Sequence, residues 1–479
     1  MINPVIINIA YIVACLTFIT GIKNLNKPTT ARKGTYISII GMVIAIVAVY
    51  FDKDIAGYGD APSWWTIDFM ATGFLWTFLA IIVGAIIGAI WSKKVKMTGM
   101  PELVALYNGF GALASALVAF SQFNNLRPAD PGVIEAVATG ITIFIGAMAF
   151  TGSMIAWGKL AGKLPGRAIV FKGQNFINAL IFLAVLAAVV VYVIPGLDPS
   201  VKFNAILVLS AASLIFGVTF VVPIGGGDMP VVISLLNSFT GLAVAAAGFL
   251  IENTALIVTG CLVGASGTIL TLIMCKAMNR SITNLLFSGF GAKDAASTKG
   301  PTSEPKAVSV EDAYMILESA RSVVFIPGYG MAVAQAQHVV KELAEKLEDN
   351  GTEVNYAIHP VAGRMPGHMN VLLAEADIPY EQLKTMDDMT PAMPTQDVAI
   401  VIGANDVVNP AAETDSSSPI YGMPIIKAYE AKTVFVLKRG KGRGFSGVEN
   451  ELFYMPNTVM IYGDAKATIS ALAGEFTSD

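Results

Sequence analysis

The chain has 479 residues, of which 54% are hydrophobic and only 14% are charged, and its formal net charge is −4. This composition lies outside the range of ordinary soluble proteins, and a mildly acidic chain without a basic stripe is not a nucleic-acid-binding protein. Residues 1–280 hold nearly all the long apolar runs, whereas residues 310–479 have a globular composition. The sequence therefore predicts a polytopic α-helical membrane domain followed by a second, soluble domain.

Nine apolar segments are long enough to cross a bilayer, which requires about 20 residues. The first lacks a basic n-region and a small-residue cleavage site, so we interpret it as a retained span rather than a signal peptide. The second is the shortest. The spans are expected over residues 4–22, 36–51, 67–91, 101–120, 134–157, 176–196, 203–222, 229–250 and 254–276.

The loops between the spans predict the orientation. The odd-numbered loops carry eleven basic residues (Lys23, Lys27, Arg32, Lys33, Lys93, Lys94, Lys96, Lys159, Lys163, Arg167 and Lys172), and the even-numbered loops carry three (Lys53, Arg127 and Lys202). Because cytoplasmic loops carry an excess of Lys and Arg, we expect the N-terminus outside and the C-terminal domain in the cytoplasm.

Two spans resemble each other. Residues 100–120 align without gaps to residues 229–249, with nine of 21 positions identical, including Asn108 with Asn237. Such internal similarity is typical of duplicated halves around a shared pathway, although small-residue spans also resemble one another by composition alone.

Polar side chains at membrane depth are candidates for a transport pathway. Asn108, Asn237 and Ser153 are such residues, and Glu102 and Asp228 lie at the start of the two similar spans. The alternatives are interhelical hydrogen bonds for the two Asn and a helix-dipole interaction for the two acids.

Metal and haem sites are not expected. Cys15, Cys261 and Cys275 lie in apolar segments without a Cys-X-X-Cys motif, as packing residues do. None of the three histidines (His338, His359 and His368) lies in a span, which excludes a membrane domain that binds haem through paired histidines.

Residues 281–310 are rich in Gly, Ser, Thr and Pro, so we interpret them as a linker between residues 1–280 and residues 311–479. Apolar strands are expected at 322–326, 354–358, 397–402, 433–437 and 458–462, and helices at 331–349, 367–375, 422–431 and 465–473. This alternation predicts an α/β Rossmann-like fold, with a parallel sheet covered on both faces.

A glycine-rich turn follows the first strand. Gly328 permits a tight turn, Gly330 lets the backbone approach a pyrophosphate, and the expected helix would offer free N–H groups. Val333 replaces the third glycine of the usual fingerprint. No acidic residue follows the second strand to hold a ribose 2′-hydroxyl, which argues against NAD.

Three further loops follow strands, where such folds bind ligands. Residues 361–367 supply Arg364, and residues 403–406 supply Asn405 and Asp406. Residues 438–444 place four cations among three glycines, a composition suited to a 2′-phosphate. The pattern indicates NADP, with a solvated basic loop as the alternative.

Long motifs in both halves resemble the beta-subunit family of proton-translocating NAD(P) transhydrogenases. They are GYGMAVAQAQ at 328–337, HPVAGRMPGHMNVLLAEA at 359–376, GANDVVNPAA at 403–412, GDAKA at 463–467, MPVVISLLNSFTG at 229–241 and IMCKAMNRS at 273–281. The resemblance covers essentially the whole chain.

The resemblance implies a reaction and a partner. Hydride would pass between NAD(H), held by a separate alpha subunit, and NADP(H) held here, coupled to proton translocation through the membrane domain. It further implies a multi-pass protein of the bacterial inner (plasma) membrane, in a dimer of alpha–beta units surrounded by lipid.

The resemblance also implies site residues. Asp406 would couple protonation to NADP affinity, while Asn108, Ser153, Asp228 and Asn237 remain candidates from their polar character in the membrane segments alone. The NADP(H) site would comprise Tyr329, Val361, Ala362, Gly363, Arg364, Met365, Pro366, Gly403, Ala404, Asn405, Asp406, Val407, Gly422, Met423, Lys438, Arg439, Gly440, Lys441, Gly442, Arg443, Gly444, Phe445, Asp464 and Ala465, in addition to Gly328 and Gly330 from the glycine-rich turn.

The chain departs from the family pattern at two positions. Many relatives have a membrane histidine where this chain has Asn108, and Asn cannot change charge near neutral pH. Phe445 stands where relatives often have Tyr. The alternative functions are a membrane transporter with a regulatory NADP-sensing domain and a structural membrane scaffold; the long motifs and the basic loop favour the transhydrogenase.

Overall fold

The structure of the chain is a computed structural model. It describes residues 4–25, 28–51, 74–95, 97–126, 132–166, 168–225, 228–279, 281–282, 304–365, 367–416, 418, 420–440 and 448–476. The chain divides into two compact units. The first contains residues 1–165, 171–222 and 233–269, and the second contains residues 166–170, 223–232 and 270–479.

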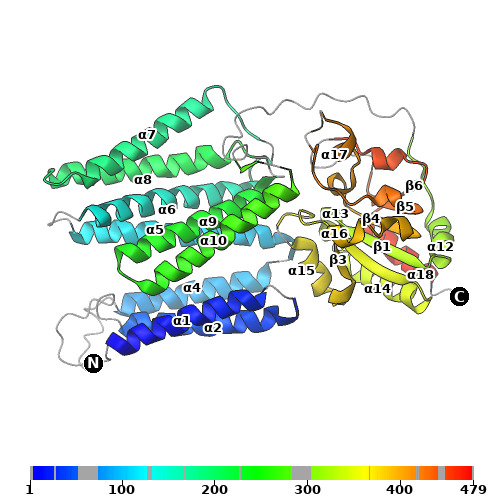
Figure 1. Cartoon of the computed structure of the whole chain (residues 1–479), viewed down its shortest axis with the longest axis horizontal. Helices are drawn as coiled ribbons and strands as arrows, with labels where there is room; N and C mark the ends of the chain where they lie inside the picture. The colour runs from blue at the N-terminus through cyan, green and yellow to red at the C-terminus, as the bar shows by residue number, and fades with distance from the viewer. Residues whose placement is uncertain are drawn as a thin grey trace. The chain divides into compact units, whose positions relative to one another are not determined.

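Among the described residues, nine helices are long and apolar enough to cross a membrane, which confirms the nine predicted spans. The third span was expected to start at residue 67, which lies outside the described residues. The nine helices are α1 (Pro4–Leu25), α2 (Pro28–Phe51), α4 (Phe74–Lys94), α5 (Met100–Leu126), α6 (Val133–Leu160), α7 (Gln174–Val193), α8 (Pro199–Val221), α9 (Met229–Leu250) and α10 (Thr254–Ala277) (Figure 1).

Small residues let the helices of the first unit approach closely. Helix α6 contacts α5, α7 and α8, and its buried face includes Gly140, Ala147, Gly152 and Ala156. Between α9 and α10, a Cβ added at Gly241 would overlap the backbone of Gly264. Lipid provides no hydrophobic force between spans, so this close backbone packing is a main source of their association.

The second unit contains a six-stranded parallel sheet in the order β3-β2-β1-β4-β5-β6 (Figure 1). The strands are β1 (Ser322–Pro327), β2 (Glu353–Ile358), β3 (Leu383–Thr385), β4 (Val398–Ile402), β5 (Thr433–Lys438) and β6 (Thr458–Tyr462). Their apolar runs are buried because both faces of the sheet are covered. Five of the strands and the α/β class were predicted; β3, with three residues, was missed.

The α-helices of this unit agree with the sequence only in part. They are α12 (Val310–Glu318), α13 (Tyr329–Ala334), α14 (Gln337–Asp349), α15 (His368–Glu375), α16 (Met386–Met389), α17 (Ala411–Thr414) and α18 (Ala465–Glu475). The single helix predicted over 331–349 is wrong, since Gln335, with φ 50°, divides it into α13 and α14.

The helix predicted over 422–431 is also wrong. Gly422 has φ 77°, a left-handed conformation, and Pro424 cannot donate a backbone hydrogen bond. Only a short 3-10 turn, η7 (Ala428–Glu430), forms there. Part of the segment is nevertheless buried, because Ile426 and Ala428 lie fully buried in the core of the sheet.

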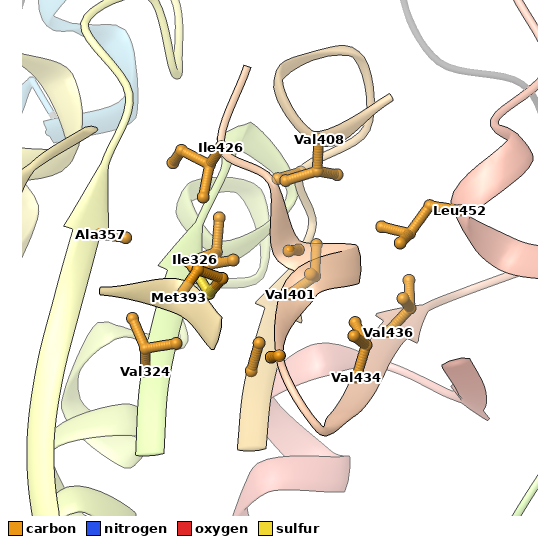
Figure 2. Close-up of a cluster of buried hydrophobic side chains, with 14 of the residues drawn as sticks. Val324, Ile326, Ala357, Met393, Val401, Val408, Ile426, Val434, Val436 and Leu452 are labelled. Carbon is orange, nitrogen blue, oxygen red and sulfur yellow. The ribbon is translucent and has the colours of Figure 1, made fainter. Parts of the chain in front are cut away.

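One face of the sheet is covered by short turns instead of long helices. Figure 2 shows alternate side chains of the central strands, among them Val324, Val401 and Val434, gathered with Met393 and Leu452 from 3-10 segments. Burying these apolar groups contributes roughly 1.5–3 kcal/mol for each large side chain. The loops at the carboxyl ends of the strands therefore rest on a buried, packed core.

Candidate functional site

The loops after β1 and β4 lie together where the order of the strands reverses. Neighbouring strands connect to opposite sides at this point, which is where doubly wound sheets bind ligands. The Gly328 N–H donates to the Ile402 oxygen at 2.9 Å, and the Gly330 N–H donates to the Gly403 oxygen at 2.9 Å. A Cβ added at Gly330 would lie 2.6 Å from the Gly403 Cα, and Gly403 has φ 63°. Glycine is therefore required by direct contact of the two backbones.

The helix that opens at this turn is short. Gly328 is the N-cap of α13, which has six residues and ends at the left-handed Gln335. This helix is therefore much shorter than the one predicted over 331–349.

Two buried histidines hold the loop that follows β2. The Val361 N–H donates to His359 Nδ1 at 3.2 Å, and the Arg364 N–H donates to His368 Nδ1 at 3.0 Å. Since Nδ1 accepts in both rings, each neutral imidazole carries its proton on Nε2. His359 Nε2 then donates to the Pro424 oxygen at 2.8 Å.

The same loop places an arginine beside the glycine-rich turn. The Arg364 guanidinium lies 4.4 Å from the centre of the Tyr329 ring, and the centre of the His368 ring lies 6.2 Å from the centre of the Tyr329 ring. Of the other predicted residues of this loop, Ala362 is buried, Val361, Gly363 and Met365 are half-buried, and Pro366 lies outside the described residues.

The loop after β4 brings a carboxylate to the same edge. Asn405 and Asp406 are half-buried, Ala404 and Val407 are buried, and Asp406 begins the short turn η6 (Asp406–Val408). Ile402 pairs with Leu437 of β5, so the loop after β4 adjoins the end of β5.

A half-buried lysine ends β5. The Lys438 ammonium lies 4.5 Å from the centre of the Phe453 ring. Burial lowers the pKa of Lys438 from its ordinary value, while the carboxylates of Asp406 and Glu449 oppose this shift. Arg439 is exposed and Gly440 half-buried, and the predicted residues Lys441, Gly442, Arg443, Gly444 and Phe445 lie outside the described residues.

Two further predicted pairs lie in turns of the same unit. The Gly422 N–H donates to the Ala412 oxygen at 2.7 Å, and Met423 is buried. Asp464 accepts from the N–H groups of Lys466 and Ala467 and so caps α18, whose first residue is Ala465. The capping bonds give the Asp464 carboxylate a structural role of its own.

In the first unit, the structure brings three predicted polar residues onto helices that touch. Asn108 Nδ2 of α5 donates a weak bond, 3.5 Å long, to the Ile233 oxygen of α9. A Cβ added at Gly109 would lie 3.1 Å from the Ser153 Cβ of α6, and one added at Gly152 would lie 3.1 Å from Leu236 Cδ2. Asn237 follows Leu236 and is half-buried.

Ser153 differs from the buried threonines of the same helix, Thr139 and Thr142, whose hydroxyls donate to main-chain oxygens. Its side chain is fully buried, and among the described residues its Oγ has no hydrogen-bond partner. The two acids lie apart from this cluster: Glu102 is in the first turn of α5, and Asp228 directly precedes α9. Asp228 is about 2.5 helical turns from Asn237 along α9, so the structure does not bring them together.

Comparison with known proteins identifies the family. The model of the NAD(P) transhydrogenase beta subunit matches residues 7–475. Two NAD(P) transhydrogenase beta subunits, one from Rhodospirillum rubrum and one from its strain ATCC 11170, are each 44% identical over 466 residues, covering 95% of this chain and 96% of theirs. The chain belongs to the NAD(P) transhydrogenase beta-subunit family. Membership confirms the resemblance predicted from the sequence motifs.

The structure of this family member also shows supporting residues that sequence reasoning missed. His359, His368, Asn450 and Phe453 are buried and contact the loops of the candidate site. Their only signal in the sequence was polar or aromatic character near the glycine-rich motifs. Asn450, for instance, contacts a residue 45 positions away.

Proposed function

We propose that this chain is the NADP(H)-binding and proton-conducting subunit of a membrane transhydrogenase. It would exchange hydride with NAD(H) bound to an alpha subunit, coupled to proton translocation. Membership of the beta-subunit family supports the enzyme class and the use of both nucleotides. The bound NADP(H) would supply the nicotinamide that gives or accepts the hydride.

The proposal rests mainly on one arrangement: the loops after β1 and β4 are hydrogen-bonded to each other, and Lys438 ends the neighbouring strand β5. Backbone contact at Gly328, Gly330 and Gly403 leaves no room for a Cβ, as a close approach to a pyrophosphate requires. Lys438 and Arg439 provide the charge for a 2′-phosphate. The residue that follows β2 is His359 rather than an acid, which fits a phosphorylated ribose better than a free 2′-hydroxyl.

The remaining predicted site residues complete this proposal. Arg364, whose guanidinium lies over the Tyr329 ring, would neutralise a phosphate. Protonation of Asp406 would remove a negative charge that acts on Lys438, and would so change the affinity of the site for NADP(H). The other proposed contacts come from Val361, Ala362, Gly363, Met365, Pro366, Ala404, Asn405, Val407, Gly422, Met423, Gly440, Lys441, Gly442, Arg443, Gly444, Phe445, Asp464 and Ala465.

For the membrane part we propose a proton pathway along α5, α6 and α9. Asn108, Ser153 and Asn237 would hold water there, and Asp228 would lie at one end of the path. The distribution of basic residues favours an N-terminus outside and a cytoplasmic C-terminal domain in the bacterial inner membrane. We propose residues 1–280, 281–310 and 311–479 as membrane domain, linker and NADP(H) domain, in a dimer of alpha–beta units.

Equilibrium binding to the purified full-length chain tests the nucleotide part. Isothermal titration should show tight binding of NADP⁺ and binding of NAD⁺ at least tenfold weaker, because one charge-assisted contact contributes about 1.5–3 kcal/mol. Equal affinity for the two nucleotides, or no binding of NADP⁺, would contradict the proposal.

A further inference from the structure

A buried asparagine supports the loop after β4. Asn450 is 1% exposed, and its Nδ2 donates to the Asn405 main-chain oxygen at 2.9 Å and to Asn405 Oδ1 at 3.1 Å. Its Oδ1 accepts from the Leu452 N–H at 3.0 Å and so caps the short turn η8 (Glu451–Tyr454). Each polar atom of this buried amide therefore has a partner, as a residue that fixes a loop requires.

The same segment touches the other side of the site. Phe453 of η8 is buried and lies under the Lys438 ammonium, with 4.5 Å between the nitrogen and the ring centre. Next to Asn450, the Glu449 oxygen accepts from Asn409 Nδ2 at 3.0 Å, which ties the segment to the end of the loop after β4. One short turn thus contacts both the Asn405–Asp406 loop and Lys438.

We infer that Asn450 is a positioning residue of the NADP(H) site, which holds the Asn405–Asp406 loop at a fixed place relative to Lys438. The inference rests on the proposed function, because it concerns the affinity of that site. The physical reason is that Asn405 is in an irregular conformation, with φ −140° and ψ −74°, and the loop has no long helix to fix it. Without the two Asn450 bonds, a bound phosphate would have to order the loop itself.

The variant Asn450→Ser tests this inference. Serine is a good N-cap, so it can still accept from the Leu452 N–H, but it is too short to reach Asn405. We expect the Kd of the full-length chain for NADP⁺ to rise about tenfold, because the main-chain oxygen of Asn405 loses one of its two donors, its Oδ1 loses the second Asn450 bond, and the loop loses its fixed position. In the holoenzyme, the KM for NADP⁺ should rise while the KM for NADH stays unchanged.

Asn457→Ser is the matched control. Asn457 Nδ2 also donates to two main-chain oxygens, those of Tyr429 at 3.0 Å and Ala431 at 2.8 Å. It directly precedes β6 and so lies at the amino edge of the sheet, away from the site. We expect this variant to lower thermal stability as Asn450→Ser does, without a change in the Kd for NADP⁺.

Hydrogen exchange of the nucleotide-free chain gives a second readout. Asn450→Ser should speed exchange of the amides of residues 404–409, whereas Asn457→Ser should not. The inference is overturned if the two variants bind NADP⁺ with the same affinity, or if exchange of these amides is unchanged by Asn450→Ser. If the wild-type chain does not bind NADP⁺, the proposed function fails as well. If the wild-type chain and both variants bind NADP⁺ with the same affinity, only the inference about Asn450 fails.

Discussion

At the scale of single residues, the loop that follows β2 depends on two neutral imidazoles. His359 and His368 each accept a main-chain N–H on Nδ1, from Val361 and Arg364 respectively. A protonated ring would place N–H against N–H at either position. Burial lowers the pKa of His359 to about 4, and burial followed by the Arg364 charge lowers the pKa of His368. Both shifts favour the neutral form that the loop needs.

The shift at His359 predicts how stability depends on pH. In the unfolded chain this histidine takes up a proton near pH 6.5, whereas in the folded chain it does so only near pH 4. The folded state is therefore progressively disfavoured as pH falls from about 6.5 to about 4, by roughly 3 kcal/mol in all. Urea titration with pulse proteolysis of the sheet domain should show this loss in the wild type and a smaller one in His359→Asn. Parallel pH profiles for the two proteins would refute the assignment.

Nucleotide specificity is expected to depend on Arg439. Removing a guanidinium from a 2′-phosphate costs about 1.5–3 kcal/mol, so Arg439→Ala should weaken NADP⁺ binding about 10- to 100-fold and leave NAD⁺ binding nearly unchanged. The matched control is Arg321→Ala, since Arg321 is exposed just before β1, at the opposite edge of the sheet. Isothermal titration with both nucleotides measures the effect. An equal loss for NADP⁺ and NAD⁺ would disprove the 2′-phosphate role.

At the scale of elements, the sequence predicted the strands better than the helices. The five main strands are apolar runs bounded by turn residues, and such runs are buried wherever a parallel sheet forms. The end of α13 was missed because Gln335, which has φ 50°, is not a glycine and gives no sign of a left-handed turn. The contacts of His359 and Asn450 were missed for another reason: their partners are 65 and 45 positions away, and no local pattern records such pairs.

Because the backbones of the loops after β1 and β4 are in direct contact, one added methyl group there should have a large effect on stability and on nucleotide binding. Gly330→Ala would place a Cβ 2.6 Å from the Gly403 Cα, so the two loops must move apart. We expect the free energy of unfolding to fall by about 1–3 kcal/mol and NADP⁺ binding to be lost. Gly474→Ala is the control, because its Cβ would meet no atom within 4 Å near the end of α18. It should be neutral or stabilising by up to about 1 kcal/mol. Thermal unfolding and nucleotide titration of both variants test this pair, and normal NADP⁺ binding by Gly330→Ala would contradict it.

In the membrane helices, alanine substitutions at Ser153 and at the equally buried Ser213 are expected to have different effects. Ser213 is equally buried, but its Oγ donates to the Leu209 oxygen at 2.6 Å within α8. Ser153→Ala should leave stability unchanged or raise it by about 1 kcal/mol, since no hydrogen bond to a described residue is lost, but it should slow proton-coupled turnover. Ser213→Ala should leave turnover unchanged. The measurement is the rate of proton-coupled turnover in liposomes. Equal rates for the wild type and Ser153→Ala would exclude Ser153 from the proton pathway.

At the scale of the whole molecule, the chain combines an apolar helical unit with a nucleotide-type sheet. Sequence composition was sufficient to predict this division, because a bilayer and a parallel sheet impose different lengths on their apolar segments. The proton path was less predictable: Asn108 lies at the expected place on α5, yet an amide does not titrate near neutral pH. In the proposed mechanism, water held by Asn108, Ser153 and Asn237 carries the proton.

The most direct test of the account is hydride transfer from NADH to an NADP⁺ analogue in liposomes that contain this chain and its alpha subunit, with the internal pH recorded. We predict transfer accompanied by a pH change in the lumen, and a loss of the pH change in the Asn237→Leu variant. Hydride transfer without any pH change in the wild type would contradict the coupling of the two units, and NADP⁺ binding without transfer would contradict the transhydrogenase function itself.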